Sequence, residues 1–208
     1  MIDIDHFSFF LGAALIVALT PGPGIFYVAA RTLAGGRREG LASSVGLGLG
    51  GLVHVIAGAV GVSALVMASA EAFTALKIFG AVYLVWLGVK AWREARILAP
   101  VDPQTTGPRR AFRDGIVVEA LNPKTAAFFL AFIPQFIDPA RPVAAQFVAL
   151  GLISVCLNTT ADIVVTHWAA MARAGLEKRP SLIVRARQAS AVVMCGLGAS
   201  LLVVRRSG

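Results

Sequence analysis

Two polar interruptions inside long apolar stretches contain the residues best suited to chemistry. The first is the run Thr20, Pro21, Gly22, Pro23 and Gly24, and the second is the run Asn122, Pro123 and Lys124. Proline lacks an N–H group and clashes with the preceding helical turn, so neither run fits a regular helix. Each helix that restarts after a break directs free N–H groups and a positive dipole end at the interruption, which suits a carboxylate. We therefore predict these eight residues as substrate-binding. A lone proline would indicate only a kink, whereas two matching breaks favour a site.

Ionisable side chains within the apolar stretches form the second group of candidates, because burying a charge in a membrane is costly. They are Lys124, Glu119, Asp162 and His54. Lys124 could bind a substrate carboxylate, and Asp162, Glu119 or His54 could bind a substrate ammonium or carry a proton. The alternative is structural: a static ion pair of Lys124 with Glu119 or Asp162, and a His54 that bonds only to a neighbouring carbonyl.

The elements that must position these residues are membrane helices. Hydrophobic residues make up 57% of the 208, charged residues only 14%, and the mean hydropathy is +0.78. A soluble domain has about 45–50% apolar and about 25% charged residues. A spanning helix needs about 20 mostly apolar residues. Six spans are predicted, over 7–30, 43–68, 72–92, 112–137, 143–170 and 188–204. The expected fold is an all-α, polytopic membrane helix bundle with polar loops over 31–41, 93–111 and 171–187.

The two breaks fall in the first and fourth spans, which divides the chain into two halves of three helices. Because three is odd, the second half enters the membrane from the opposite side, as in an inverted-topology repeat. The predicted boundaries are a first repeat over 1–93, a cytoplasmic linker over 94–111 and a second repeat over 112–208. Most of the 19 lysines and arginines lie in or beside the three polar loops. The positive-inside rule therefore places both termini outside, in the periplasm of a bacterium.

Small residues recur every four positions in the second predicted span, at Gly46, Gly50 and Gly58, with His54 in the same stripe. Such a stripe permits close helix contact, which places His54 at a helix interface. Glycine stripes fit packing within the bundle or in a homodimer equally well.

Several motifs together resemble the lysine exporter (LysE/RhtB) family of amino-acid exporters. They are the runs over 20–24, 35–41, 121–125 and 128–136. Asp162 and His54 also resemble family positions. The resemblance implies a secondary active transporter that exports an amino acid or a derivative from the bacterial cytoplasm across the inner membrane. It also implies proton antiport through six helices in two inverted repeats. Direction and coupling come from this resemblance and not from the spacing.

Other functions are less well supported by the residues. The net charge of +8 arises at the ends of spans, where membrane orientation and anionic lipid headgroups account for it, so no nucleic-acid partner is expected. No catalytic triad or metal-ligand spacing appears, so we expect neither an enzyme nor a cofactor. Two alternatives remain: a divalent-metal exporter using His54, Cys156 and Asp162, and a membrane redox carrier. The redox carrier would need Cys156 and Cys195 with Cα atoms within ~7 Å.

Overall fold

A computed structural model describes residues 4–68 and 105–176 continuously, with isolated residues or pairs between 71 and 93 and single residues between 188 and 199. All regular structure in this part of the chain is helical, which confirms the all-α prediction. The elements are α1 (Ile4–Leu19), α2 (Pro23–Ala68), α4 (Pro108–Ala120), α5 (Pro123–Ala127), a π-helical turn (Phe128–Phe132), a 3₁₀ turn (Ile133–Phe136) and α6 (Val143–Leu176). The predicted spans over 72–92 and 188–204 lie, apart from these isolated positions, outside the described residues.

Three helical segments are long and apolar enough to cross a membrane, namely Pro23–Ala64, Pro108–Phe136 and Val143–Met171, in the described part of the chain. The apolar helix Phe7–Leu19 is shorter. These segments overlap the predicted spans over 7–30, 43–68, 112–137 and 143–170, although Pro23–Ala64 also covers the loop predicted over 31–41.

α2 consists of two antiparallel arms that meet at Gly36. Gly36 has φ 75° and ψ −171°, a conformation that glycine adopts without steric cost. The arms pair across this turn, since a side chain on Gly40 would collide with Thr32, and one on Gly24 would meet Leu47. The prediction of a polar loop over 31–41 is therefore wrong, because helix continues on both sides of a one-residue turn at Gly36.

Polar residues around this turn bond to neighbouring helices, which explains why helix extends beyond the apolar stretch. Glu39 Oε1 accepts hydrogen bonds from the backbone N–H groups of Thr106 (3.1 Å) and Gly107 (2.7 Å), where α4 begins. Arg37 lies 2.6 Å from His167 Nε2 on α6. These contacts tie the end of the α2 hairpin to α4 and α6.

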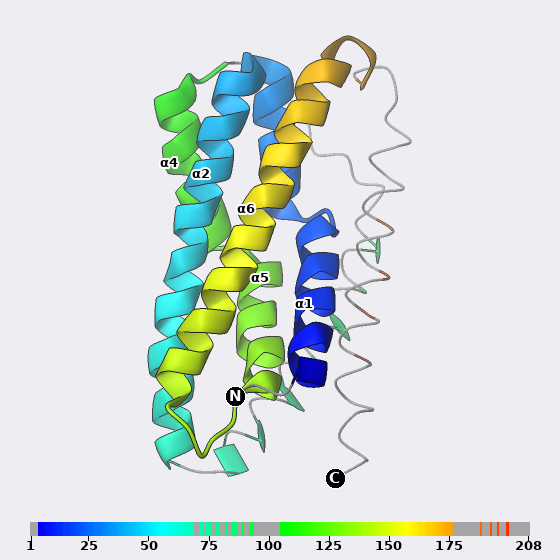
Figure 1. Cartoon of the computed structure of the whole chain (residues 1–208). Helices are drawn as coiled ribbons and strands as arrows, with labels where there is room; N and C mark the ends of the chain where they lie inside the picture. Colours follow the sequence, from blue (N-terminus) through cyan, green and yellow to red (C-terminus); the bar gives the residue numbers. More distant parts are fainter. Residues whose placement is uncertain are drawn as a thin grey trace.

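α2 packs along α4 and α6, and α1 packs against α6 (Figure 1). The glycine stripe lies within this bundle, because added side chains at Gly46 and Gly50 would strike the α4 backbone at Phe112 and Ile116. A cluster of fully buried side chains fills the interior beyond the breaks: Phe10, Phe129, Phe132, Phe147, Ile133 and Leu150.

Both broken helices stop and restart within a few residues. The chain leaves α1 at Leu19 and restarts at Pro23, and it leaves α4 at Ala120 and restarts at Pro123. Each proline is the first residue of the new helix, where its missing N–H costs nothing. After the second break the helix is irregular, with a π-helical turn followed by a 3₁₀ turn. Pro134 explains this, since it cannot donate to the preceding turn and regular α-helix is lost around it.

Candidate functional site

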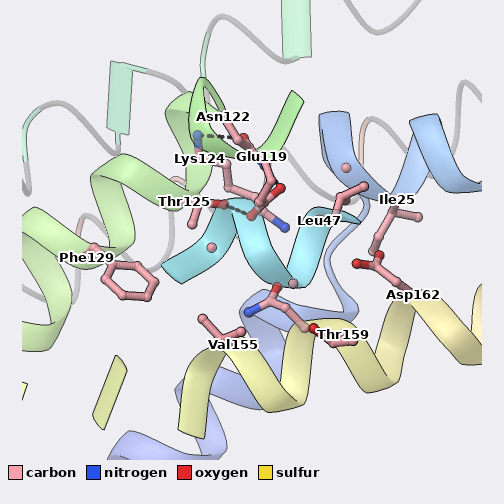
Figure 2. A pocket seen from close by; sticks show the side chains of 14 residues that line it. Ile25, Leu47, Glu119, Asn122, Lys124, Thr125, Phe129, Val155, Thr159 and Asp162 are labelled. Carbon is pink, nitrogen blue, oxygen red and sulfur yellow. Dashed lines mark hydrogen bonds between the residues drawn. The ribbon is translucent and has the colours of Figure 1, made fainter. Parts of the chain in front are cut away.

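A small cavity lies where the two breaks meet (Figure 2). The space open to the centres of water molecules is about 20 Å³, enough for about one water. Four segments line it, at the start of α2, in the second arm of α2, around the second break and along α6. The lining residues are Gly24, Ile25, Leu47, Gly48, Gly51, Glu119, Asn122, Lys124, Thr125, Phe129, Val155, Asn158, Thr159 and Asp162.

The second break fixes the carboxyl group of Glu119. Asn122 is the N-cap of α5, and its side-chain oxygen accepts a bond from the backbone N–H of Lys124 at 3.0 Å. Asparagine is favoured at such positions because it satisfies a free amide of the first turn. The Asn122 amide donates to Glu119 Oε2 at 2.9 Å, and the Thr125 hydroxyl donates to Glu119 Oε1 at 2.6 Å (Figure 2). Both oxygens of this buried carboxyl are thus engaged.

The ammonium group of Lys124 reaches across to the first break. It donates to the carbonyl of Val17 at 3.1 Å and to that of Thr20 at 2.9 Å, at the end of α1. The Val17 carbonyl also accepts the Thr20 backbone N–H at 3.2 Å, whereas the Thr20 carbonyl lies beyond the last turn of α1. A helix C-terminus attracts a cation. Gly22 makes room for the side chain, since an added Cβ would lie 3.1 Å from Lys124 Cδ. In the described part of the chain, Lys124 forms no ion pair within 4.0 Å with Glu119 or Asp162.

Glu119 occupies the matching position on the other side of the first break. A Cβ added to Gly24 in the first turn of α2 would lie 2.9 Å from Glu119 Oε2. The carboxyl group therefore lies against the positive end of α2. Both ionisable side chains of the second break thus contact the helix ends at the first break. Lys124 caps the end of α1, and Glu119 faces the start of α2.

Asp162 enters the cavity from α6 and is only 4% exposed. Among the described residues its carboxyl group has no hydrogen-bond or ion-pair partner. Asn158 and Thr159 precede it by about one helical turn and line the same cavity. Asp162 is therefore the acidic group of the cavity whose bonding capacity is not already used.

His54 lies behind the second break and not in the cavity lining. Its Nε2 atom lies 2.9 Å from the backbone oxygen of Glu119, and its ring is 5.7 Å from that of Phe129. This contact matches the structural alternative given for His54, a bond to a neighbouring carbonyl. It connects the second arm of α2 to the end of α4.

Five of the eleven residues predicted as functional line the cavity: Gly24, Asn122, Lys124, Glu119 and Asp162. Two others, Thr20 and Gly22, contact Lys124. Pro21, Pro23 and Pro123 lie in the breaks without lining the cavity.

Three polar lining residues were absent from the predicted set: Thr125, Asn158 and Thr159. The spacing of Asn158 and Thr159 from Asp162, which places them on one helix face, was a usable signal for these two. Nothing in the sequence indicated that Thr125 reaches Glu119.

The two cysteines are free thiols. Cys156 is exposed on α6, and the Cys195 thiol lies 3.6 Å from the backbone oxygen of Val85. Among the described residues, His54, Cys156 and Asp162 form no metal-binding group of three.

Comparison with known proteins places these features in a family. The family model described as "LysE type translocator" matches residues 15–205. A homoserine/homoserine lactone efflux protein of Salmonella typhimurium is 34% identical over 168 residues, which cover 80% of each chain. A leucine efflux protein of Klebsiella pneumoniae is 29% identical, over 74% of this chain and 75% of its own. A Vibrio cholerae protein named only as an uncharacterized membrane protein is 36% identical, over 75% of this chain and 77% of its own. No solved structure matches.

Proposed function

Because the chain belongs to the LysE type translocator family, we propose that it exports an amino acid or a close derivative from the bacterial cytoplasm. As a member of this family it is a membrane translocator and not an enzyme. Relatives named for homoserine and leucine efflux support an amino-acid cargo. The observation that carries the proposal is the Asp162 carboxyl group, which is buried and has no partner among the described residues, at the cavity between two broken helices.

The cavity offers a place for each charged group of an amino acid. Gly24 and Ile25 line it from the first turn of α2, where backbone N–H groups and the helix dipole suit a carboxylate. Asp162 lines it from α6 and suits an ammonium group. Leu47 and Val155 supply apolar walls for a side chain.

The remaining break residues act on the substrate mainly through geometry. The first backbone N–H of α5, that of Lys124, already donates to the Asn122 side chain. This helix end therefore presents the side chains of Asn122 and Thr125 to the cavity and not a free backbone donor. Lys124 holds the end of α1 in place, and Asn122 and Thr125 hold the Glu119 carboxyl group at the cavity wall. A proline begins each helix that follows a break, and the Thr20 hydroxyl donates to the Ile16 carbonyl in the last turn of α1.

Substrate entry requires the cavity to enlarge, because its present space holds about one water. Alternating access through the two broken helices provides this enlargement. Proton antiport follows if one carboxyl group takes either the substrate ammonium or a proton, but not both together. Asp162 is the first candidate for this exchange and Glu119 the second, with His54 bonded to the Glu119 backbone.

The proposed topology has six helices in two inverted repeats, 1–93 and 112–208, joined by a cytoplasmic linker over 94–111. Both breaks then lie near the centre of the inner membrane, and both termini lie in the periplasm. Two features support this arrangement: each break restarts a helix at a proline, and both breaks contribute to one cavity.

Efflux from proteoliposomes loaded with labelled homoserine or leucine tests the proposal. An imposed pH gradient should change the efflux rate of the wild-type protein. Asp162→Asn should slow efflux about 30-fold, because a hydrogen bond to a charged group contributes about 2 kcal/mol. Asp138→Asn is the matched control, since Asp138 is half-exposed in a surface pair with Arg141, and its efflux should be unchanged.

Three results would count against the proposal. Wild-type liposomes that release no amino acid, but do release a divalent metal ion, would replace it with metal export. Normal efflux in Asp162→Asn would remove Asp162 from the site. Efflux indifferent to the pH gradient would refute the antiport while leaving amino-acid export in place.

A further inference from the structure

An arginine cluster lies at the start of α4, on the face of the helix that does not pack against α2. Arg109, Arg110 and Arg113 are exposed and line a hollow of about 610 Å³ together with Thr106, Gly107, Pro108 and Asp114. Arg110 pairs with Asp114 at 3.6 Å. Arg109 and Arg113 make no ion pair or hydrogen bond with the residues that the structure describes. Two cationic side chains are therefore available to an external anion.

An apolar stripe continues from these arginines along α4. Arg109, Arg113, Val117 and Leu121 follow one another at four-residue spacing and share one face of the helix. Val117 is 56% exposed and Leu121 76% exposed. This face thus carries two unpaired cations at one end and uncovered hydrocarbon below them.

The depth of the arginines matches the level of lipid phosphates. A helix rises about 1.5 Å per residue, so Arg109 lies about 20 Å along the axis from the break at Asn122. With the break at the bilayer centre, as proposed above, the hydrocarbon boundary lies about 15 Å away. Arg109 then stands beside the headgroups, and Arg113, about 14 Å from the break, reaches them by extending its long side chain.

We propose that this face of α4 binds an anionic phospholipid of the cytoplasmic leaflet. The lipid phosphate lies between Arg109 and Arg113, and one acyl chain runs along Val117 and Leu121. A soluble phosphate would match the charges but would leave the apolar stripe uncovered, so we assign the site to a lipid. The backbone N–H of Gly107, just before α4, already donates to the Glu39 carboxylate. The attraction for the lipid phosphate therefore comes from the arginine side chains.

The test compares lipid binding to the purified full-length protein in detergent, by native mass spectrometry and by the shift in unfolding temperature. Phosphatidylglycerol and phosphatidylcholine with identical acyl chains are the two probes. Two arginines beside an anionic headgroup predict about a 30-fold preference for phosphatidylglycerol. The double variant Arg109→Gln/Arg113→Gln should lose this preference. Arg38→Gln, which removes an exposed arginine of α2 near the same end, should keep it.

A second variant and a soluble probe separate the lipid from a free anion. Val117→Ser/Leu121→Ser retains both arginines and should bind phosphatidylglycerol about tenfold more weakly, since it loses most of the apolar contact. Glycerol phosphate should give no stabilisation at concentrations where the lipid does. Unchanged lipid preference in the arginine double variant, equal loss in Arg38→Gln, or equal binding of glycerol phosphate would each overturn the proposal.

Discussion

Replacing Lys124 with methionine should destabilise the protein by about 3 kcal/mol while leaving amino-acid binding to the folded protein within a few-fold of wild type. The change keeps the length of the side chain and removes only its ammonium group. That group is the donor that closes the end of α1, at 3.1 Å from the Val17 carbonyl and 2.9 Å from the Thr20 carbonyl.

The magnitude follows from these two bonds. A hydrogen bond from a charged donor contributes about 1.5–3 kcal/mol, so the pair contributes about 3–6 kcal/mol. The methionine variant avoids the desolvation cost of burying an ammonium group, and this offsets part of the lost hydrogen-bond energy. The loss of a cation at a helix C-terminus removes a further ~1 kcal/mol. A net loss near 3 kcal/mol results.

Gly22→Ala tests the same contact without touching the lysine. Its Cβ would lie 3.1 Å from Lys124 Cδ and 3.3 Å from Nζ, so it should press the side chain away from α1 and cost about 1–2 kcal/mol. Gly12→Ala is the matched control, because an added Cβ at Gly12 meets nothing within 4 Å.

Denaturant unfolding in detergent micelles and hydrogen exchange in the last turn of α1 provide the assay, with amino-acid affinity measured on the folded fraction. Lower unfolding free energy and faster exchange in both Lys124→Met and Gly22→Ala are expected. Unchanged stability in Lys124→Met together with abolished amino-acid binding would refute the reasoning. In that case the ammonium group would serve the substrate carboxylate.

Two further changes probe the cavity wall and the end of the hairpin. Gly48→Ala would place a Cβ 2.7 Å from Thr159 Oγ1 and should slow efflux about tenfold through overpacking. The control Gly61→Ala, whose Cβ would meet nothing within 4 Å, should leave efflux unchanged. Equal effects of the two changes would contradict the cavity assignment. Glu39→Ala removes the acceptor of two backbone amides where α4 begins. Hydrogen exchange of these amides should become about 30-fold faster, since each unsatisfied amide costs about 1–3 kcal/mol. Unchanged exchange would show that this contact is dispensable.

The sequence allowed prediction of the breaks because their cause is local. Proline acts on the turn that contains it, so the runs at 20–24 and 122–124 could be identified without any tertiary information. Long apolar stretches likewise indicated the helices over 43–68 and 143–170. Asp162 was found because an acidic residue in the middle of such a stretch is costly unless it has a function.

The partners of Lys124 could not be predicted, because they are backbone carbonyls more than 100 residues away. In the sequence the nearest opposite charge is Glu119, which suggested an ion pair. In the structure the side chains of Asn122 and Thr125 satisfy Glu119, and the open end of α1 takes the lysine. The single-residue turn at Gly36 escaped prediction for a similar reason. Hydropathy falls over 31–41, but Arg37 lies within hydrogen-bond distance of His167 on α6, and Glu39 bonds the backbone where α4 begins.

The Lys124 bridge has a consequence for how the protein is made. Translation and membrane insertion proceed from the N-terminus, so α1 enters the bilayer while the residue that closes its last turn is still 104 positions from Thr20. Until that lysine emerges, the Thr20 carbonyl at the end of α1 lacks the donor it has in the finished protein, at a depth where water is scarce. The first half of the chain is therefore expected to settle only after the ribosome has passed the second break, and a truncated product ending before residue 124 should be a ready target for membrane proteases.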